Sequence, residues 1–171
     1  MYGNQKCSVF SAEINKDIYA KQIEEVSEYP NINLFNTDTL SFFKNDLFAK
    51  KHFDMIYLDY CGSYTLDKEN TIKQIFKNKN LKSGDIFALT FELCRERNDK
   101  DSGEKHLKQT DLYKITCCED IAEYFNNRVG VIKAAVGHFA REGGSHINEI
   151  FSEVYRNKDG SPNMLFVVYR V

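Results

Sequence analysis

The chain has 171 residues, with 25 acidic and 23 basic side chains and a formal net charge of −2. That length predicts about one domain with its own core, since roughly 150 residues per domain is usual. A hydrophobic share of 42% and an aromatic share of 13% exclude a disordered chain. The near-neutral charge excludes an overall polyanion-binding surface, but not a local basic groove.

Several features predict a reduced, cytoplasmic protein. The longest apolar runs, such as residues 86–89 and 164–169, are too short to cross a bilayer. The first seven residues lack the charged-then-apolar order of a signal peptide. The five cysteines have neither zinc-type spacing nor the density of a secreted scaffold, and the four histidines lack metal spacing. We therefore expect free cysteines and no metal centre.

The first part of the chain alternates short strands with helices. A helix with Asn15 as its N-cap carries apolar side chains at helical spacing and ends before Pro30. A second helix carries Leu40, Phe43 and Leu47 on one face. Strands are predicted at residues 7–12, 32–36 and 53–59.

The later part continues this alternation and then changes character. A helix begins near Asp67 or Asn70, and a turn at 81–85 leads into a buried strand at 86–91. Residues 95–108 mix charges of both signs and predict a polar mobile loop, with a substrate lid as the alternative. One more helix is expected near 121–125, while 132–136 fits a strand or a helix.

The end of the chain favours a hairpin. Asp159-Gly160 stands between apolar runs at 150–155 and 164–171, which is a turn signal, although residues 147–155 also fit a helical stripe. Strands separated by helix-sized connections predict parallel βαβ units. The predicted fold class is thus α/β and Rossmann-like. We expect a mostly parallel open sheet with helices on both faces and a C-terminal antiparallel hairpin, in a single domain over residues 1–171.

Three acidic residues follow three successive predicted strands: Glu13, Asp38 and Asp59. Ligands of open α/β sheets bind outside the carboxyl ends of the strands, so these acids are candidate ligand contacts. Helix N-caps and first turns also favour acids, and either role explains any one of the three. Their recurrence at the same topological place favours a site.

Around these acids the chain resembles the class I S-adenosylmethionine-dependent methyltransferases. Phe10–Asn15 resembles the second-strand motif and Asn36–Thr39 the third-strand motif of that family. Phe53–Ser63 resembles the fourth-strand motif, and Leu81–Thr90 the turn that enters the fifth strand. The resemblance implies that Glu13 binds the cofactor ribose and that Asp38, with Thr39 beside it, contacts the adenine.

The resemblance also implies a role for Asp59-Tyr60-Cys61-Gly62. Amino-methylating members carry here an acid or amide that accepts a hydrogen bond from the target amine, followed by a ring that stacks on the base. Asp59 and Tyr60 are therefore the candidate catalytic residues, and a nucleic-acid amine is the implied target. The alternative is a plain turn in which Gly62 relieves strain and the tyrosines pack.

The sequence departs from the family at its start. The family's glycine-rich turn, on which the cofactor rests, belongs before Cys7, where Gly3 is the one glycine. The first β-α unit is therefore expected to be missing. Three explanations stay open: a truncated chain, a partner chain that completes the pocket, or lost cofactor binding. The alternative function is a catalytically inactive domain that binds a partner or nucleic acid.

Overall fold

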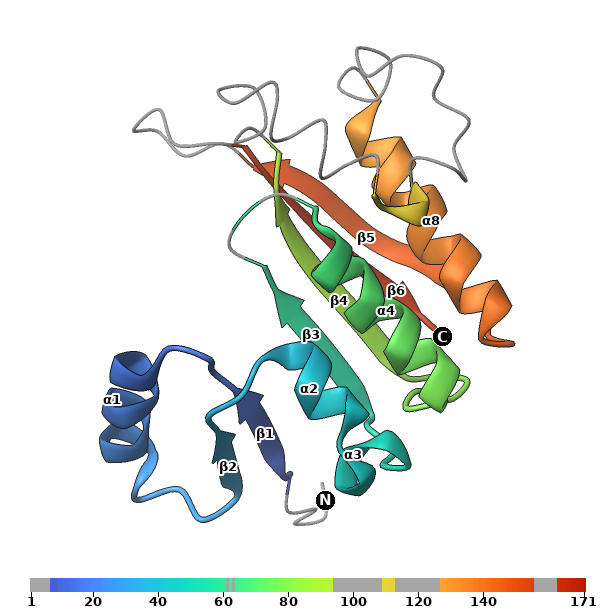
Figure 1. Cartoon of the computed structure of the whole chain (residues 1–171). Coiled ribbons are helices and arrows are strands. Elements are labelled where there is room, and N and C mark those ends of the chain that lie inside the picture. Colours follow the sequence, from blue (N-terminus) through green and yellow to red (C-terminus); the bar gives the residue numbers. More distant parts are fainter. Residues whose placement is uncertain (1–6, 61, 63, 94–108, 113–126, 156–162) are drawn as a thin grey trace, which may run out of the picture. The chain divides into compact units, whose positions relative to one another are not determined.

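The computed structural model describes residues 7–60, 62, 64–93, 109–112, 127–155 and 163–171 (Figure 1). The chain divides into two compact units, Met1–Phe48 and Ala49–Val171, and each is described by itself below. The predicted polar loop at 95–108 and the predicted helix near 121–125 lie outside the described residues. Among the described helices, none has the length and apolar character that crossing a membrane requires.

The first unit is a βαβ arrangement followed by two short helices. Strand β1 (Val9–Ala12) pairs in parallel with β2 (Ile32–Phe35), and helix α1 (Lys16–Val26) connects them. Helices α2 (Thr39–Lys44) and α3 (Asp46–Ala49) follow. The Asn15 side chain accepts hydrogen bonds from the backbone N–H groups of Asp17 and Ile18, which confirms it as the N-cap of α1.

Four phenylalanine rings form the packed centre of this unit, and we call them the aromatic cluster. Phe48 stacks on Phe42 with ring centroids 4.0 Å apart and meets Phe35 edge-on at 5.0 Å. Phe10 lies 6.0 Å from Phe48, so the cluster joins both strands to α2 and α3. Aromatic pairs in these geometries add to the free energy gained by burial alone.

The single helix predicted through Leu47 is wrong, because the structure has two. Asn45 leaves the helical conformation, with a φ of −66° and a ψ of 135°, and ends α2. Its side chain then accepts a hydrogen bond from the backbone N–H of Leu47 at 2.9 Å, which starts α3. The break turns Leu47 outward, with 77% of its surface exposed, while Phe48 enters the aromatic cluster.

The second unit holds a four-stranded sheet in the order β3-β4-β6-β5. Strand β3 (Met55–Asp59), helix α4 (Leu66–Asn78) and β4 (Ile86–Glu92) form a parallel βαβ unit. Helix α8 (Arg128–Glu142) then leads to β5 (Asn148–Tyr155) and β6 (Met164–Arg170). Residues 132–136 are thus helical, and β5 and β6 confirm the predicted antiparallel hairpin.

The prediction of a mostly parallel sheet is wrong for this unit. Strand β6 pairs antiparallel with both β4 and β5, so two of the sheet's three pairings are antiparallel and the sheet is mixed. The cause is the hairpin itself. Its second strand inserts between the first strand and β4, and a hairpin strand runs opposite to its partner.

Both described helices of the second unit lie on one face of its sheet, which we call the inner face (Figure 1). The Phe76 ring of α4 meets the Phe87 ring of β4 edge-on at 5.2 Å. On α8, Lys133 donates to the Ser152 hydroxyl of β5 at 2.8 Å. The expected arrangement of helices on both faces is therefore not seen among the described residues of this unit.

Candidate functional site

The carboxyl ends of β1 and β2 bring two of the predicted acids to one edge of the first unit. The Glu13 backbone N–H donates to the Phe35 carbonyl at 2.9 Å, one step beyond the last paired residues of the two strands. The Asn36 side chain donates back to the Glu13 carbonyl at 2.9 Å. Asp38 follows two residues later as the N-cap of α2. The parallel pairing of β1 and β2 thus places Glu13 and Asp38 at the same edge of the sheet.

Each of these carboxylates accepts a hydrogen bond from a nearby backbone N–H. Oε1 of Glu13 accepts from the Asn15 backbone N–H at 2.7 Å, and Oδ1 of Asp38 accepts from that of Ser41 at 2.8 Å. Hydrogen bonds from the Ser41 hydroxyl and backbone hold the pKa of the Asp38 carboxyl below its ordinary value. Asp38 is therefore ionised at neutral pH. Thr39, the first residue of α2, is half-buried beside it.

The second unit has its own carboxyl edge, where Asp59 ends β3. Asp59 and Thr90 are paired in register, and the Thr90 hydroxyl donates to Oδ1 of Asp59 at 2.5 Å. Tyr57 points to the same face as Asp59, since side chains two apart on a strand share a face. Burial raises the pKa of the Tyr57 phenol, the Thr90 hydroxyl opposes that shift, and the Asp59 charge adds to it.

Tyr60 is separated from Asp59 by this alternation. Its side chain is buried on the other face, 5.2 Å from the Phe91 ring, with the Lys68 ammonium 5.1 Å from its own ring. Burial raises the pKa of its phenol. The structure therefore places Asp59 at the surface and the Tyr60 ring in the interior.

The loop after β3 depends on a glycine. Gly62 has a φ of 127°, a conformation that a residue with a Cβ rarely adopts. Its carbonyl accepts from the Glu92 backbone N–H at 3.1 Å, which fastens the loop to the end of β4. The expectation that Gly62 relieves strain in this turn is confirmed.

Thr90 is a residue that the predicted site set did not contain. A threonine near the end of a buried strand is ordinary in a sequence, because the β-branched side chain favours strands. Its contact with Asp59 follows from the parallel register of β3 and β4. Only a prediction of how the two strands pair in register would therefore have placed Thr90 beside Asp59.

No protein-family model matches the chain, and a search of curated proteins finds no match. Solved structures do match. The N-methyltransferase NodS from Bradyrhizobium japonicum superposes with a TM-score of 0.58 at 13% identity, over 95% of this chain and 72% of NodS. The fold is Rossmann-like and is shared with methyltransferases. The resemblance predicted from the sequence is confirmed at the level of the fold.

Two further structures extend this finding. An rRNA methylase from Streptococcus thermophilus gives a TM-score of 0.52 at 10% identity, over 96% of this chain and 74% of the methylase. Fibrillarin from Aeropyrum pernix gives 0.50 at 13% identity, over 94% of this chain and 55% of fibrillarin. That fibrillarin carries natively bound S-adenosyl-L-methionine, and NodS was also solved with S-adenosyl-L-homocysteine.

Proposed function

We propose that this chain is a methyltransferase-like protein that binds S-adenosylmethionine through the carboxyl edge of β1 and β2. The observation that carries the proposal is the parallel pairing that sets Glu13 and Asp38 at one strand edge, in a chain with the fold of cofactor-bound methyltransferases. When bound, the cofactor supplies a methyl group on a sulfonium.

The donor chemistry of this edge fits the nucleoside part of the cofactor. Among the described residues, Oε2 of Glu13 accepts no hydrogen bond, so it is available to a ribose hydroxyl. The ionised Asp38 is an acceptor suited to the adenine amine, and Thr39 adds a hydroxyl beside it. Local backbone hydrogen bonds hold both carboxylates before a ligand arrives, which reduces the entropy lost on binding.

For the transfer step we propose Asp59 as the group that accepts a hydrogen bond from the target amine. The Thr90 hydroxyl orients its carboxylate and leaves it exposed. Methyl displacement depends on aligning the nucleophile more than on strong acid–base groups, and one oriented acceptor serves that purpose. We retain Tyr60 as the candidate stacking residue. Its burial means that this role requires the loop around Gly62 to move.

The proposed acceptor is a nucleic-acid amine in a cytoplasmic setting. An rRNA methylase among the similar structures supports this class of substrate. A formal charge of −2 argues for recognition through a local surface and not through a broad basic face.

A second candidate function is an inactive domain that binds a partner or nucleic acid. The observation that favours it is that Glu13 and Asp38 each accept a local backbone hydrogen bond, and Asp38 caps α2, roles that need no ligand. A partner that completes the pocket belongs to either proposal. Strand β3 pairs with β4 alone among the described strands, and its Met55 and Tyr57 are about half exposed, at 56% and 48%.

Isothermal titration with S-adenosylhomocysteine separates the two candidates. Glu13→Gln and Asp38→Asn keep a side-chain oxygen that can accept the local backbone hydrogen bond and remove the charge, so both variants are expected to fold. We expect each variant to bind S-adenosylhomocysteine at least about tenfold more weakly than the wild type, since a charged hydrogen bond contributes about 1.5–3 kcal/mol. Asp46→Asn, an exposed acid of α3, is the matched control and should bind like the wild type.

Two outcomes count against cofactor binding. Wild-type protein that gives no heat at high ligand concentration excludes it for this chain alone. If all three variants bind the ligand with the affinity of the wild type, the ligand does not bind through the charges of Glu13 and Asp38. In the first case, a mobility shift with RNA and DNA then tests the binding-module alternative.

A further inference from the structure

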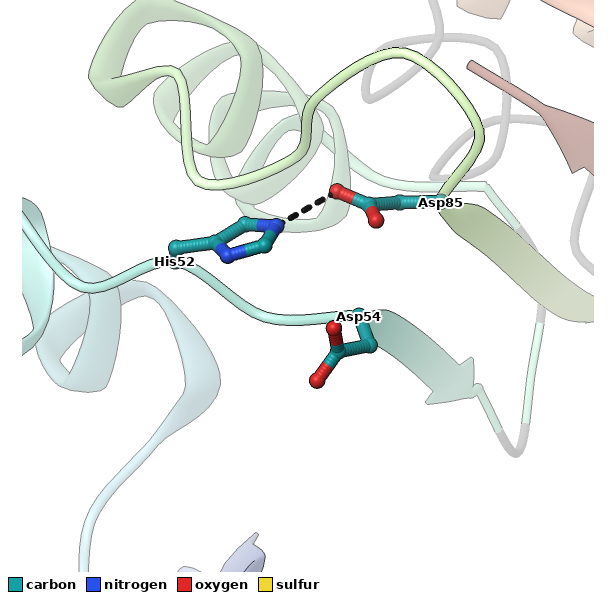
Figure 2. A group of neighbouring side chains, drawn as sticks. All are labelled: His52, Asp54 and Asp85. Carbon is teal, nitrogen blue, oxygen red and sulfur yellow. Dashed lines mark hydrogen bonds and ion pairs between the residues drawn. The ribbon is translucent and has the colours of Figure 1, made fainter.

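Three side chains of types that can ligate metals lie together at the amino edge of the second unit, at the other end of β3 and β4 from Asp59. They are His52, Asp54 and Asp85, and their donor atoms all lie within 4.8 Å of one another (Figure 2). None of them belongs to the site proposed above. No local sequence pattern predicts this group, because Asp54 and Asp85 are 31 positions apart in the chain.

The backbone holds this group in place. Met55 and Ile86 are the first paired residues of β3 and β4, so Asp54 and Asp85 occupy adjacent positions just before the ladder. The Ile86 N–H donates to the Asp54 carbonyl at 3.0 Å, and the Val171 N–H donates to the Asp85 carbonyl at 3.0 Å. The strand ends that carry the two carboxylates are thus fixed by hydrogen bonds.

The loop that carries His52 is fastened on both sides of it. The buried Asn80 side chain donates to the Lys51 carbonyl at 2.7 Å, and the Phe53 N–H donates to the Asn80 carbonyl at 2.9 Å. The imidazole therefore projects from a constrained backbone, and only side-chain torsions need to change for a ligand.

The side chains are only partly committed to one another. Oδ2 of Asp85 lies 2.8 Å from Nε2 of His52 and accepts from the Lys82 N–H at 2.6 Å. That leaves the other carboxylate oxygen of Asp85 for a metal ion. The Asp54 carboxylate makes no hydrogen bond or ion pair within the described parts of the chain. Two carboxylates beside one imidazole create a negative site that a cation neutralises.

We propose that His52, Asp54 and Asp85 bind a divalent transition metal ion of the zinc type. One imidazole nitrogen and two carboxylate oxygens form a donor set that suits Zn²⁺, whereas Mg²⁺ and Ca²⁺ prefer oxygen ligands alone. Zinc ligands lie about 2.0–2.2 Å from the ion, so side-chain torsions must bring the Asp54 carboxylate and the His52–Asp85 pair around one point when it binds. Three protein ligands leave a coordination position for water.

Binding would join the loop before β3 to the turn before β4. The ion replaces the hydrogen bond between His52 and Asp85 with bonds that also include Asp54, so it stabilises the folded unit through mass action. This role is independent of the cofactor binding proposed for the first unit. Failure of one proposal therefore leaves the other standing.

Thermal unfolding with added Zn²⁺ tests the site. We expect zinc to raise the Tm of the wild-type protein, and His52→Ala and Asp54→Asn to weaken zinc binding at least about tenfold. His138→Ala is the matched control, because His138 forms a comparable surface pair with Glu142 at 3.3 Å but has no third ligand within the described residues. Its zinc response should equal that of the wild type.

Cobalt spectroscopy separates this site from binding by cysteine thiolates. Co²⁺ bound by imidazole and carboxylate gives visible ligand-field bands without thiolate charge transfer, and those bands should vanish in His52→Ala. A thiolate charge-transfer band, unchanged zinc affinity in His52→Ala, or no zinc response in the wild type would overturn the proposal. Because His52 and Asp54 are exposed, both variants should fold normally without metal.

Discussion

Replacing Glu69 by alanine should destabilise the second unit more than any surface substitution. Glu69 lies on α4 with none of its surface exposed, and it accepts four hydrogen bonds. Two come from the backbone N–H groups of Asp111 and Leu112, at 2.8 and 3.0 Å, one from Lys73 at 2.7 Å and one from Tyr64 at 3.1 Å.

The expected magnitude follows from the groups left behind. Tyr64, Asp111 and Leu112 each lose a hydrogen-bond acceptor, and each buried donor left without one costs about 1–3 kcal/mol. The Lys73 ammonium is partly exposed and keeps its ion pair with Asp111 at 2.6 Å, so its loss of Glu69 adds less. We therefore expect Glu69→Ala to reduce the free energy of unfolding by about 3–5 kcal/mol.

Urea unfolding followed by circular dichroism measures this loss, with Glu142→Ala as the control. Glu142 is 62% exposed and, among the described residues, pairs with His138 alone, so its removal should cost less than about 1 kcal/mol. Hydrogen exchange adds a local readout, because the amides of Asp111 and Leu112 should exchange faster in Glu69→Ala. A loss of under about 1 kcal/mol, or unchanged exchange at both amides, would refute the reasoning.

Three further predictions concern single side chains. Phe48→Ala should reduce the stability of the first unit by about 3 kcal/mol, measured by hydrogen exchange in β1 and β2, and unchanged exchange would contradict the role of the aromatic cluster. Asp38→Ala should cost about 1 kcal/mol at neutral pH through loss of the helix cap. Because folding lowers the pKa of Asp38, its charged form stabilises the fold at every pH above the ordinary pKa of an aspartate. Urea unfolding at decreasing pH should show this contribution disappear as the pH falls through the pKa of the folded state. A penalty for Asp38→Ala that grows in acid would argue against that cause. Thr90→Val should raise the pKa of Tyr57 further, since the Thr90 hydroxyl lowers it. NMR titration of ¹³C-labelled tyrosine measures this, and the same Tyr57 pKa in the variant and the wild type would contradict the prediction.

Local signals predicted the elements that local physics decides. The cap at Asn15 is confirmed, because a capping side chain acts over a few residues. The antiparallel pairing of β5 and β6 confirms the predicted hairpin, whereas its predicted turn at Asp159-Gly160 lies outside the described residues. Residues 132–136 fitted a strand or a helix, since a short apolar run has no distinguishing period. Packing decided the matter, with Ile132, Ala135 and Val136 fully buried in α8.

Other features depended on contacts between distant residues, which a sequence does not display. The break at Asn45 occurs because Phe48 joins rings from β1, β2 and α2. Glu69 has the spacing of a surface acid on a helix, and its burial arises from a segment more than 40 residues later. Strand alternation likewise explains why adjacent Asp59 and Tyr60 point to opposite faces.

Hydrogen exchange with added S-adenosylhomocysteine tests the central claim most directly. If the cofactor binds at this edge, the backbone amides that follow β1 and β2, at residues 13–18 and 36–41, exchange more slowly, and those of the β5–β6 hairpin do not change. Glu13→Gln with Asp38→Asn should abolish that protection while the exchange of the free protein stays the same. Unchanged exchange at both segments in saturating ligand would contradict a cofactor site at this edge.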